Sequence, residues 1–596
     1  MLNSRRYLEA VLPLCALLLP LPGKSMGAGV FTWHNDNSRT GANLNETVLT
    51  PASVNHANFG KLFSFAVDGQ IYAQPLYVPN VAIAGQGTHN VVFVATEHDS
   101  VYAFDADGLV ATPLWHVSFV NGTTVIPVPV ADVIETGDLT TEIGITATPV
   151  IDPVAGILYV NAKTKETSGT TITYAQRLHA LDLGTGAEKL GGPVVLQATV
   201  PGTGAGNDGA GHVSYNPLRQ NQREALVLAN GVVYIASASH GDIGPYHGWV
   251  LGYNTTTLQQ VMAYNATPDG QDGGIWQSGA GAAVDSGGNL YVVTGNGDFN
   301  ADSGGRNYGD TFLKISPSGA VLDFFTPFDQ ASLSSADLDM GSTGGIVLPD
   351  QPGSHPHLYV SSGKNGTLYL VDRDNMGHFN ASNNNQIVQS IPNIFPTGGI
   401  GAVFDSPVYW NNIVYFSGYA NVIKAFQISN GLFNASPVSQ TTTSFGLRGA
   451  AMSVSANGTT HGILWAIEYP NDGATEVLHA YDATNLATEL YNTTQAGARD
   501  NLGPGMKFTP PTIVNGKVYV AAASHLTVLG ATALPSPCDV NKDGSTNVAD
   551  VQADVNAALG VIMCTSAYDI NKDTSCNIID VQRVVNAALG GQCVSP

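Results

Sequence analysis

A short run in which an aromatic residue lies between two apolar residues recurs eight times along the chain. The first and last aromatics, Phe93 and Tyr519, are separated by seven intervals of about 61 residues each. The eight aromatics are Phe93, Tyr159, Tyr234, Tyr291, Tyr359, Tyr415, Trp465 and Tyr519. Runs of apolar, aromatic and β-branched residues bounded by Gly, Asn and Asp are typical of strands, so each run predicts one strand of a repeated unit.

A second apolar run follows each of these strands. Five of the eight second runs end in Asp or Asn, at Asp105, Asp182, Asn254, Asp372 and Asp482. Such residues indicate a strand that enters a turn. Strand pairs that recur at one period predict a repeat architecture, and four-stranded blades around an axis leave few open sheet edges. The sequence therefore predicts an all-β fold, an eight-bladed β-propeller spanning residues 28–532.

The two ends of the predicted propeller each hold an incomplete blade. The C-terminal end supplies three strands around Tyr519, and the N-terminal end supplies one, Lys61–Val67. We expect Lys61–Val67 to form the outer strand of the last blade, because ladder hydrogen bonds would then tie the two ends together. Pro113–Phe119 is the matching outer strand of the first blade. Three insertions, 120–145, 202–223 and 298–309, are expected on the end faces.

Composition and charge narrow the class of protein. The chain of 596 residues contains 67 Gly, only 12% charged residues and a formal net charge of −23. Such an acidic chain without a basic stripe excludes nucleic acid as a partner. Arg5 and Arg6 precede a Leu-rich stretch, which predicts a signal peptide over residues 1–27 and a secreted or periplasmic protein. The apolar core of that stretch is too short to span a membrane.

A different module follows a short Pro-containing linker, 533–537. It spans residues 538–596 and contains two similar segments offset by 30 residues, beginning at Asp539 and Asp569. Its four cysteines are Cys538, Cys564, Cys576 and Cys593. An even number of cysteines in a small exported module predicts two disulfides, with three possible connectivities. Proximity favours Cys538–Cys564 with Cys576–Cys593.

Each segment of the module has the spacing of a calcium-binding loop. Carboxylate, amide and carbonyl oxygens recur at loop positions 1, 3, 5, 7, 9 and 12, which is how one loop surrounds a hard cation. The predicted ligands are Asp539, Asn541, Asp543, Ser545, Asn547 and Asp550, then Asp569, Asn571, Asp573, Ser575, Asn577 and Asp580. Thr574 replaces the glycine expected at the sharp turn, where Gly544 stands in the first loop, so we expect weaker or strained binding there.

An amphipathic helix is predicted behind each loop, with Val551, Val555, Ala558 and Leu559 on one face and Val581, Val585, Ala588 and Leu589 repeating it. The module resembles a type I dockerin, an EF-hand-like pair of loop–helix repeats with Asp at position 12. The resemblance implies attachment to a cohesin-like surface protein. Positions 10 and 11, which read the partner in that family, are Val548–Ala549 and Ile578–Ile579 here.

The propeller resembles the quinoprotein alcohol dehydrogenases, eight-bladed propellers that use pyrroloquinoline quinone and calcium. The resemblance rests on the opening from Trp33 to Leu49, on "ALDLGTGAEKL" at Ala180–Leu190, on "TGNGDFNADSGGRNYGD" at Thr294–Asp310 and on "SSADLDMGS" at Ser334–Ser342. It implies that Asp337, beside Asp339, is the catalytic base and that Asn296 is a calcium ligand. A one-residue shift in "SHGDIGPYHG" at Ser239–Gly248 makes Asp242 the acidic ligand.

The chain also departs from that family. The family's adjacent cysteine pair is absent, because the predicted propeller contains no cysteine, and Leu190 replaces the tryptophan of the docking motif. Two hypotheses follow. The one we favour from the sequence is a secreted, non-catalytic propeller that binds a small polar ligand, a glycan or a partner on an end face. The alternative is a quinone- and calcium-dependent oxidoreductase acting on an alcohol or sugar; a polysaccharide-degradation component is a weaker one.

Overall fold

The computed structural model describes residues 29–133, 139–469, 473–532, 536–541 and 546–594. The expected signal peptide, most of the linker and two predicted calcium ligands, Asp543 and Ser545, lie outside the described residues. Among the residues described, no helix is long and apolar enough to cross a membrane.

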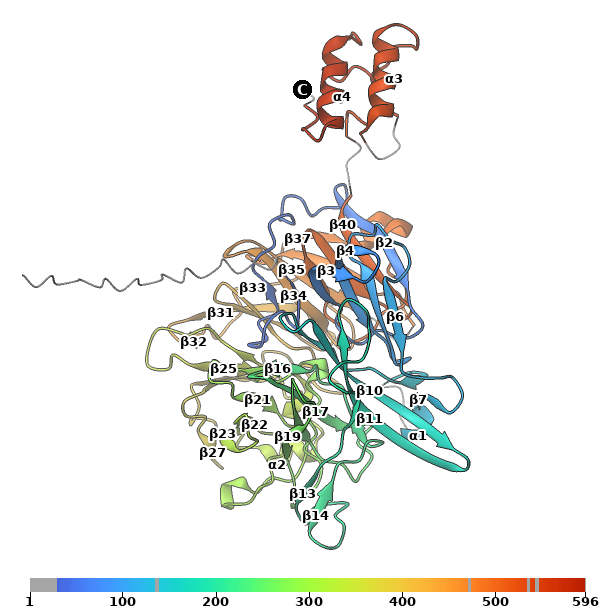
Figure 1. Cartoon of the computed structure of the whole chain (residues 1–596). Coiled ribbons are helices and arrows are strands. Elements are labelled where there is room, and N and C mark those ends of the chain that lie inside the picture. Colours follow the sequence, from blue (N-terminus) through green and yellow to red (C-terminus); the bar gives the residue numbers. More distant parts are fainter. Residues whose placement is uncertain (1–28, 134–138, 470–472, 533–535, 542–545, 595–596) are drawn as a thin grey trace, which may run out of the picture.

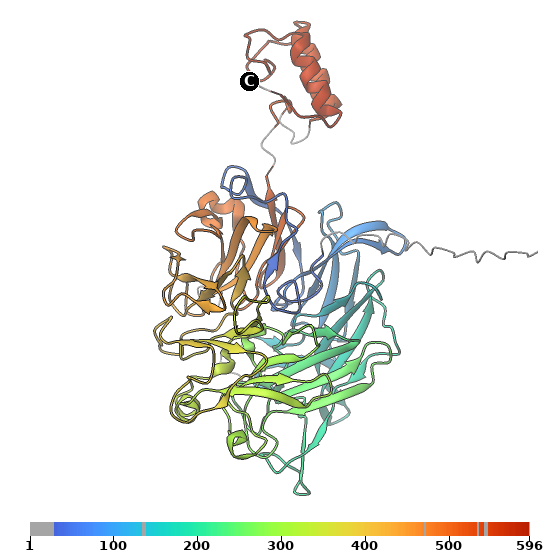
Figure 2. The same cartoon turned by 90° about the vertical axis from the view of Figure 1, so that its left-hand side faces the viewer.

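Eight antiparallel sheets form the blades of a propeller, as the sequence predicts (Figures 1 and 2). Blade 1 contains β3 (Leu76–Ile83), β4 (Gly87–Ala95), β5 (Ser100–Asp105) and β6 (Trp115–Ser118), and blade 2 contains β9 (Val150–Asp152), β10 (Ile157–Ser168), β11 (Thr171–Asp182) and β12 (Val194–Val195). Blade 3 contains β16 (Val227–Ala229), β17 (Val232–Ser239), β18 (Trp249–Asn254) and β19 (Gln260–Asn265), and blade 4 contains β20 (Ala283–Val284), β21 (Leu290–Val293), β22 (Phe312–Ile315) and β23 (Val321–Thr326).

Blade 5 contains β24 (Ile346–Val347), β25 (Leu358–Ser361), β26 (Leu368–Asp372) and β28 (Gln389–Ile391), and blade 6 contains β29 (Val408–Trp410), β30 (Ile413–Ser417), β31 (Ile423–Ser429) and β33 (Ser439–Gln440). Blade 7 contains β34 (Ala450–Asn457), β35 (Thr460–Glu468), β36 (Val477–Asp482) and β37 (Glu489–Asn492), and blade 8 contains β38 (Thr512–Val514), β39 (Lys517–Ala521), β40 (His525–Ala531) and β2 (Phe59–Ala66). Short strands on blade edges or loops are β1 (Ala42–Asn43), β7 (Val125–Pro129), β8 (Glu142–Ile143), β13 (Thr199–Pro201), β14 (His212–Ser214), β15 (Gln220–Asn221), β27 (His378–Phe379) and β32 (Leu432–Phe433). Two short helices, α1 (Val130–Val133) and α2 (Gln330–Ser335), lie in connections.

The hydrophobic core is divided into clusters between neighbouring blades. The recurring aromatics belong to this packing, and several also join blades through their hydroxyl groups. Tyr159 donates to the Thr255 carbonyl of the next blade at 2.9 Å, and Tyr415 donates to the Ala483 carbonyl at 2.6 Å. Tyr519 donates to the Ala106 carbonyl at 3.0 Å, across the junction of the last and first blades. The recurring run around each aromatic residue therefore forms a strand, and in several blades its hydroxyl group also bonds to the next blade.

The predicted ring closure is confirmed. β2 pairs antiparallel with β40, in a register that places Phe65 opposite Leu526, and becomes the outermost strand of the blade that contains Tyr519. β6 pairs with β5 as the outer strand of the first blade, also as predicted. Strand β2 begins two residues before the predicted Lys61 and ends one before Val67.

The segment before β2 contacts every blade in ring order, which the sequence did not predict. Its partners from blade 1 to blade 8 are Tyr77 with Val30, Ile151 with Phe31, Leu228 with Asn37, Val284 with Asn37, Val347 with Ser38, Tyr409 with Thr40, Val454 with Gly41 and Ile513 with Asn43. Arg39 lies at its centre, fully buried, and donates to the Ala282 carbonyl at 3.0 Å and the Trp33 carbonyl at 2.8 Å. We call Val30–Asn43 the hub segment.

Two predicted insertions meet beside the turn that holds Asp269. Arg306, from 298–309, donates to both carboxylate oxygens of Asp269 at 2.9 Å. The Thr203 backbone amide, from 202–223, donates to the same carboxylate at 3.2 Å. These insertions are joined to each other through blade 3 and are not independent loops.

The C-terminal module lies outside the propeller and contains α3 (Val548–Ala558) and α4 (Ile578–Ala588), which pack side by side (Figures 1 and 2). The predicted helices are present, but the expected apolar face is wrong at its ends, because Leu559 and Leu589 are 73% and 84% exposed. Ala557 and Val584 are buried instead. Each helix is oriented so that the residues nearest its partner helix, and not the terminal leucine, lie in the small core.

The disulfide pairing that proximity favoured is also wrong. The bonds are Cys538–Cys593 and Cys564–Cys576. Packing of α3 against α4 brings the two ends of the module together, so the first cysteine meets the last. The inner pair then closes a separation of only 12 residues.

Candidate active site on one end face

Three loops of blades 3 to 5 bring the predicted propeller residues to one end face. Asp242 follows β17, Asn296 follows β21 and Asp337 precedes β24. Asp242 and Asn296 follow the second strands of blades 3 and 4, whereas Asp337 follows the fourth strand of blade 4. Because the strands of a blade alternate in direction, the second and fourth strands end on the same face. Residues 41 positions apart in sequence, Asn296 and Asp337, are thereby brought into contact.

Asp337 is held by two donors at one oxygen. Its Oδ1 accepts from Asn296 Nδ2 at 2.9 Å and from Lys364 Nζ at 2.9 Å. The Lys364 side chain is only 14% exposed, whereas that of Asp337 is 68% exposed. A largely buried ammonium therefore orients a carboxylate that faces solvent.

Asp339 lies behind Asp337 and is buried. Its Oδ2 is 3.5 Å from Lys364 Nζ, while its Oδ1 has no hydrogen-bond partner among the described residues. Burial raises the pKa of Asp339 to about 6, against the lowering effect of Lys364, and the charges of Asp337 and Asp242 raise it further. The side-chain oxygen of Asn296, Oδ1, is likewise buried without a described partner.

Asp242 joins this group electrostatically but not by a direct bond. Its Oδ1 accepts from Tyr246 at 3.2 Å and from Ser239 at 3.4 Å, both within its own loop. Burial is the main cause that raises the pKa of Asp242, and Asp337 raises it further while Lys364 lowers it. The three predicted residues thus converge, with Asn296 and Asp337 in contact and Asp242 turned toward Tyr246.

The backbone at these loops is unusual. Asp242 and Asp337 have φ of 55° and 53°, and two neighbouring aspartates, Asp272 and Asp310, have φ of 65° and 50°. Left-handed non-glycine residues concentrate at sites where surrounding structure holds them. Asp310 accepts from the Met340 amide at 3.1 Å and so fixes the loop that carries Asp337 and Asp339.

One wall of the site is Trp276. Its indole nitrogen donates to the Ser239 carbonyl at 3.1 Å, and Tyr246 packs edge-on against it at 5.8 Å between ring centroids. A Cβ at Gly274 or Gly295 would lie 2.7 Å or 2.6 Å from the indole ring. Only glycine at both positions allows the backbone to approach the indole this closely.

Sequence reasoning missed Lys364, Trp276 and Tyr246. Lys364 lies in "SSGKNG", between the paired strands of blade 5, and is one of only 23 basic residues in the whole chain. Because Lys364 is a single cation at a strand end near the predicted acidic loops, its position in the sequence could have identified it as a site residue. Trp276 carries no such signal, because its role depends on the loops that pack around it.

Some of the oxygen atoms at this site are suitable ligands for a hard cation, but they do not form a complete coordination site. Among the described residues no three His, Cys, Asp or Glu side chains are arranged to hold a metal ion. The two orphaned oxygens, Asn296 Oδ1 and Asp339 Oδ1, are nevertheless of the type that calcium prefers. Lys364 supplies positive charge beside them.

In the predicted calcium loops of the module, carboxylates accept hydrogen bonds from backbone amides of the same loop. Asp580 accepts from the Asn571 and Asn577 amides at 3.0 and 2.9 Å, and Asp550 accepts from the Asn541 and Asn547 amides at 3.1 and 2.9 Å. In the second loop, Asp569 accepts from the Asp573 and Thr574 amides at 3.0 and 2.8 Å, and Asp573 from the Ser575 amide at 2.9 Å. The bonds of Asp550 and Asp580 repeat between the two segments, as the sequence repeat does.

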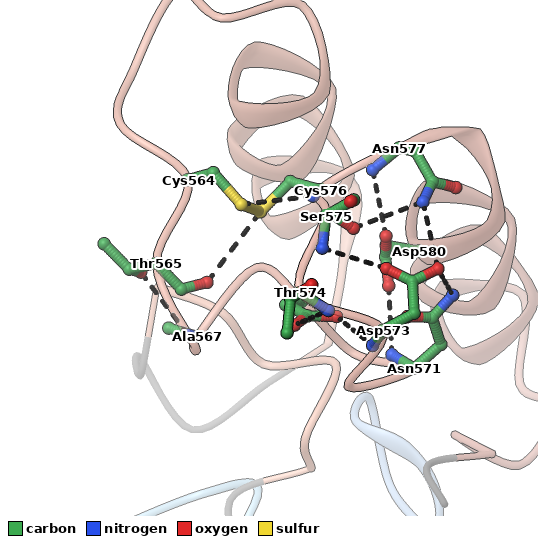
Figure 3. The surroundings of a disulfide bond; sticks show 11 residues. Cys564, Thr565, Ala567, Asn571, Asp573, Thr574, Ser575, Cys576, Asn577 and Asp580 are labelled. Carbon is green, nitrogen blue, oxygen red and sulfur yellow. Dashed lines mark hydrogen bonds between the residues drawn. A yellow bond between two sulfur atoms is a disulfide. The ribbon is translucent and has the colours of Figure 1, made fainter.

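The second loop is also tied by a disulfide (Figure 3). Cys576 follows Ser575 inside the loop, and its bond to Cys564 fixes the loop to the connection between the helices. Thr574, predicted to replace a glycine at the turn, has φ of 75°, the left-handed conformation that glycine adopts more readily. The backbone at Thr574 thus has the conformation that favours glycine, and weaker calcium binding at this loop stays a prediction.

No family model matches the chain, and no curated protein matches it in sequence. Among solved structures, the quinohemoprotein alcohol dehydrogenase of Comamonas testosteroni is similar at a TM-score of 0.54 and 15% identity, over 84% of this chain and 80% of that one. A quinohemoprotein alcohol dehydrogenase of Pseudomonas putida HK5 gives 0.53 and 13%, over 84% and 80%. A europium-containing methanol dehydrogenase gives 0.53 and 13%, over 84% and 98%. The chain has the propeller fold of these dehydrogenases.

Proposed function

We propose that the propeller is an oxidoreductase that uses pyrroloquinoline quinone and a hard cation to oxidise an alcohol or a sugar at this end face. The observation that carries the proposal is the contact of Asn296 and Lys364 with one oxygen of Asp337, beside two orphaned buried oxygens. The resemblance of the sequence to the quinoprotein alcohol dehydrogenases points to the same two residues, Asn296 and Asp337. The shared fold with quinone-dependent dehydrogenases supports the proposal.

The side chains have distinct roles in this proposal. No described side chain donates to Asp337 Oδ2, so this exposed oxygen is placed to take the hydroxyl proton of a substrate. Lys364 and Asn296 orient the carboxylate through Oδ1. Asn296, Asp339 and Asp242 would hold the cation, calcium or a lanthanide such as europium. The bound quinone would accept the hydride from the substrate carbon.

The test is reconstitution of the full-length protein with the quinone and either calcium or europium, followed by dye reduction on a panel of alcohols and sugars. Asp337→Asn should lower the rate by at least about a hundredfold, the usual size of a general-base contribution. Asp302→Asn, at an exposed aspartate outside the site, should leave it unchanged. Turnover that survives in Asp337→Asn would contradict the assignment.

The favoured hypothesis from the sequence, ligand binding without turnover, remains a second candidate. The observation behind it is that Lys364 already lies between Asp337 and Asp339, so the site carries its own cation. The absence of cysteine from the propeller agrees with it. Quinone or sugar binding without dye reduction, weakened by Lys364→Met, would select this candidate.

For the C-terminal module we propose calcium binding and attachment to a surface partner of the cohesin type, in a secreted or periplasmic protein. Val548 and Ile578, at position 10 of the two loops, are 79% and 74% exposed, and Ile579 is 49% exposed. Exposed apolar residues on a small module are typical of docking surfaces. A role in polysaccharide degradation is a weaker alternative that rests on this kind of attachment.

Calcium titration of the full-length protein tests this assignment. We expect two calcium ions per chain, and one ion fewer in Asp543→Ala. Chelation should loosen the module and leave the propeller transition unchanged, because separate cores stabilise the two parts. A protein that binds no calcium at millimolar concentration would refute the loops as metal sites.

A further inference from the structure

A cavity of about 510 Å³ lies between the first and second blades, away from the end-face site. One wall is the outermost strand of blade 1, β6, with the loop that follows it. The other is the long β10–β11 hairpin, which extends beyond the ring in Figure 1. The volume falls within the range of about 300–1,000 Å³ that is usual for small-molecule sites.

An apolar cluster joins blades 1 and 2 and includes Val94, Leu158 and Leu181. The cavity lies at the edge of this cluster, where polar side chains of the hairpin replace apolar packing. Here the hairpin presents Thr164 and Glu166 from β10 and Arg177 and His179 from β11. The outer strands β6 and β12 contain only four and two residues, so they cover little of this face.

The polar side chains of the cavity are already positioned by one another. Arg177 donates to Glu166 in a close ion pair and to Thr164 Oγ1 at 3.2 Å, and Thr164 donates to Glu166 at 3.0 Å. The bond from Arg177 lowers the pKa of Glu166. On the same strand as Arg177, His179 pairs closely with Glu188. Such pairing fixes donors and acceptors before a ligand arrives, which limits the entropy lost on binding.

The rest of the lining is apolar and includes one aromatic ring. Phe119 stacks on the His179 ring at 3.7 Å between centroids. Val117, Val125, Leu181 and Pro193 complete the apolar surface. A ligand that fits this lining has one apolar face and hydrogen-bonding groups at its edge.

The charged groups of the cavity are already paired. Arg177 pairs with Glu166 and His179 pairs with Glu188, so a strongly ionic ligand would have to compete with these pairs. Hydroxyl groups suit the mixture, because each can donate to a carboxylate and accept from the guanidinium. We infer that this cavity is a binding site for a neutral sugar, with the ring face on Val117 and Phe119 and the hydroxyls on Arg177, Glu166 and Glu188.

Calorimetric titration of the full-length protein with cellobiose, maltose, lactose and xylobiose tests the inference. At least one of these disaccharides should bind with a Kd of about 1 mM or tighter. Arg177→Met, which keeps the apolar stem and removes the donors, should weaken binding at least tenfold. Val117→Trp, on a short outer strand, should abolish binding by filling the cavity.

Two control variants separate this site from others. Arg306→Met removes an exposed arginine whose ion pair, with Asp269, lies outside the cavity, and should leave sugar affinity unchanged. Asp302→Asn, at an exposed aspartate outside both sites, should also leave it unchanged. Failure of all four sugars to bind, or binding that survives both cavity variants, would overturn the inference.

Discussion

Asp405 lies fully enclosed at the channel side of blade 6, and its carboxyl has a pKa raised to about 8 by burial, in spite of the lowering charge of Arg448. Between about pH 4 and 8 the folded protein therefore holds a proton at Asp405 that the unfolded chain releases. The free energy of unfolding should fall as pH rises through this window, by up to about 1.4 kcal/mol per pH unit from this group.

Asp405→Asn removes that proton exchange. The variant should show a flatter dependence of the unfolding free energy on pH between 5 and 8, measured by denaturant titration at several pH values. Asp302→Asn, at an exposed position, is the matched control and should keep the original slope. An unchanged slope in Asp405→Asn would show that other groups set the dependence.

Asp554 in the module is a second buried acid with a testable cost. Neither of its carboxylate oxygens has a partner among the described residues, and burial together with Asp580 raises its pKa to about 6. The sequence repeat places Val584 at the equivalent position of the second helix, also buried. Asp554→Val should therefore stabilise the module by about 1–3 kcal/mol, the cost of an unpaired buried polar group. A loss of module stability, measured by its melting transition, would show that the carboxylate is needed.

At the scale of elements, the recurring aromatics join blades. Tyr519 closes the junction between the last and first blades through its bond to the Ala106 carbonyl. Tyr519→Phe should lower the unfolding free energy by about 0.5–1.5 kcal/mol or more, because that buried carbonyl loses its donor. Tyr409→Phe is the control, since its hydroxyl bonds only to Asn412 at an exposed turn. Equal effects of the two changes in denaturant titrations would argue against a tether.

Across the whole molecule, the hub segment and β2 hold the ring by different means. The hub segment bonds to all eight blades from inside, and β2 completes the last blade from outside. A chain that begins at Phe59 loses the hub segment together with residues 44–58, and one that begins after Asp68 also loses β2. We expect the melting temperature to fall in the first chain and to fall further in the second. Melting at the original temperature in the first chain would show that the hub segment adds no stability.

The ring architecture could be predicted from the sequence because each blade is a local unit. Strands at Phe93, Tyr159 and their successors follow from apolar runs bounded by turn residues, and the eight copies of the run define the count. The closing strand could also be predicted, because three strands at one end need a fourth. Local periodicity carries these features, so no long-range contact had to be known.

The parts that the sequence did not reveal depend on groups distant in the chain. The hub segment has no periodic pattern, since its successive residues bond to different blades and Asn37 bonds to two. Lys364 and Trp276 join the site only through the packing of separate loops. The disulfide pairing depended on how α3 and α4 pack. The sequence by itself determined the repeated units and the candidate acids Asp242 and Asp337. Only the tertiary structure decided which groups meet, because closing the ring places residues far apart in sequence on one face.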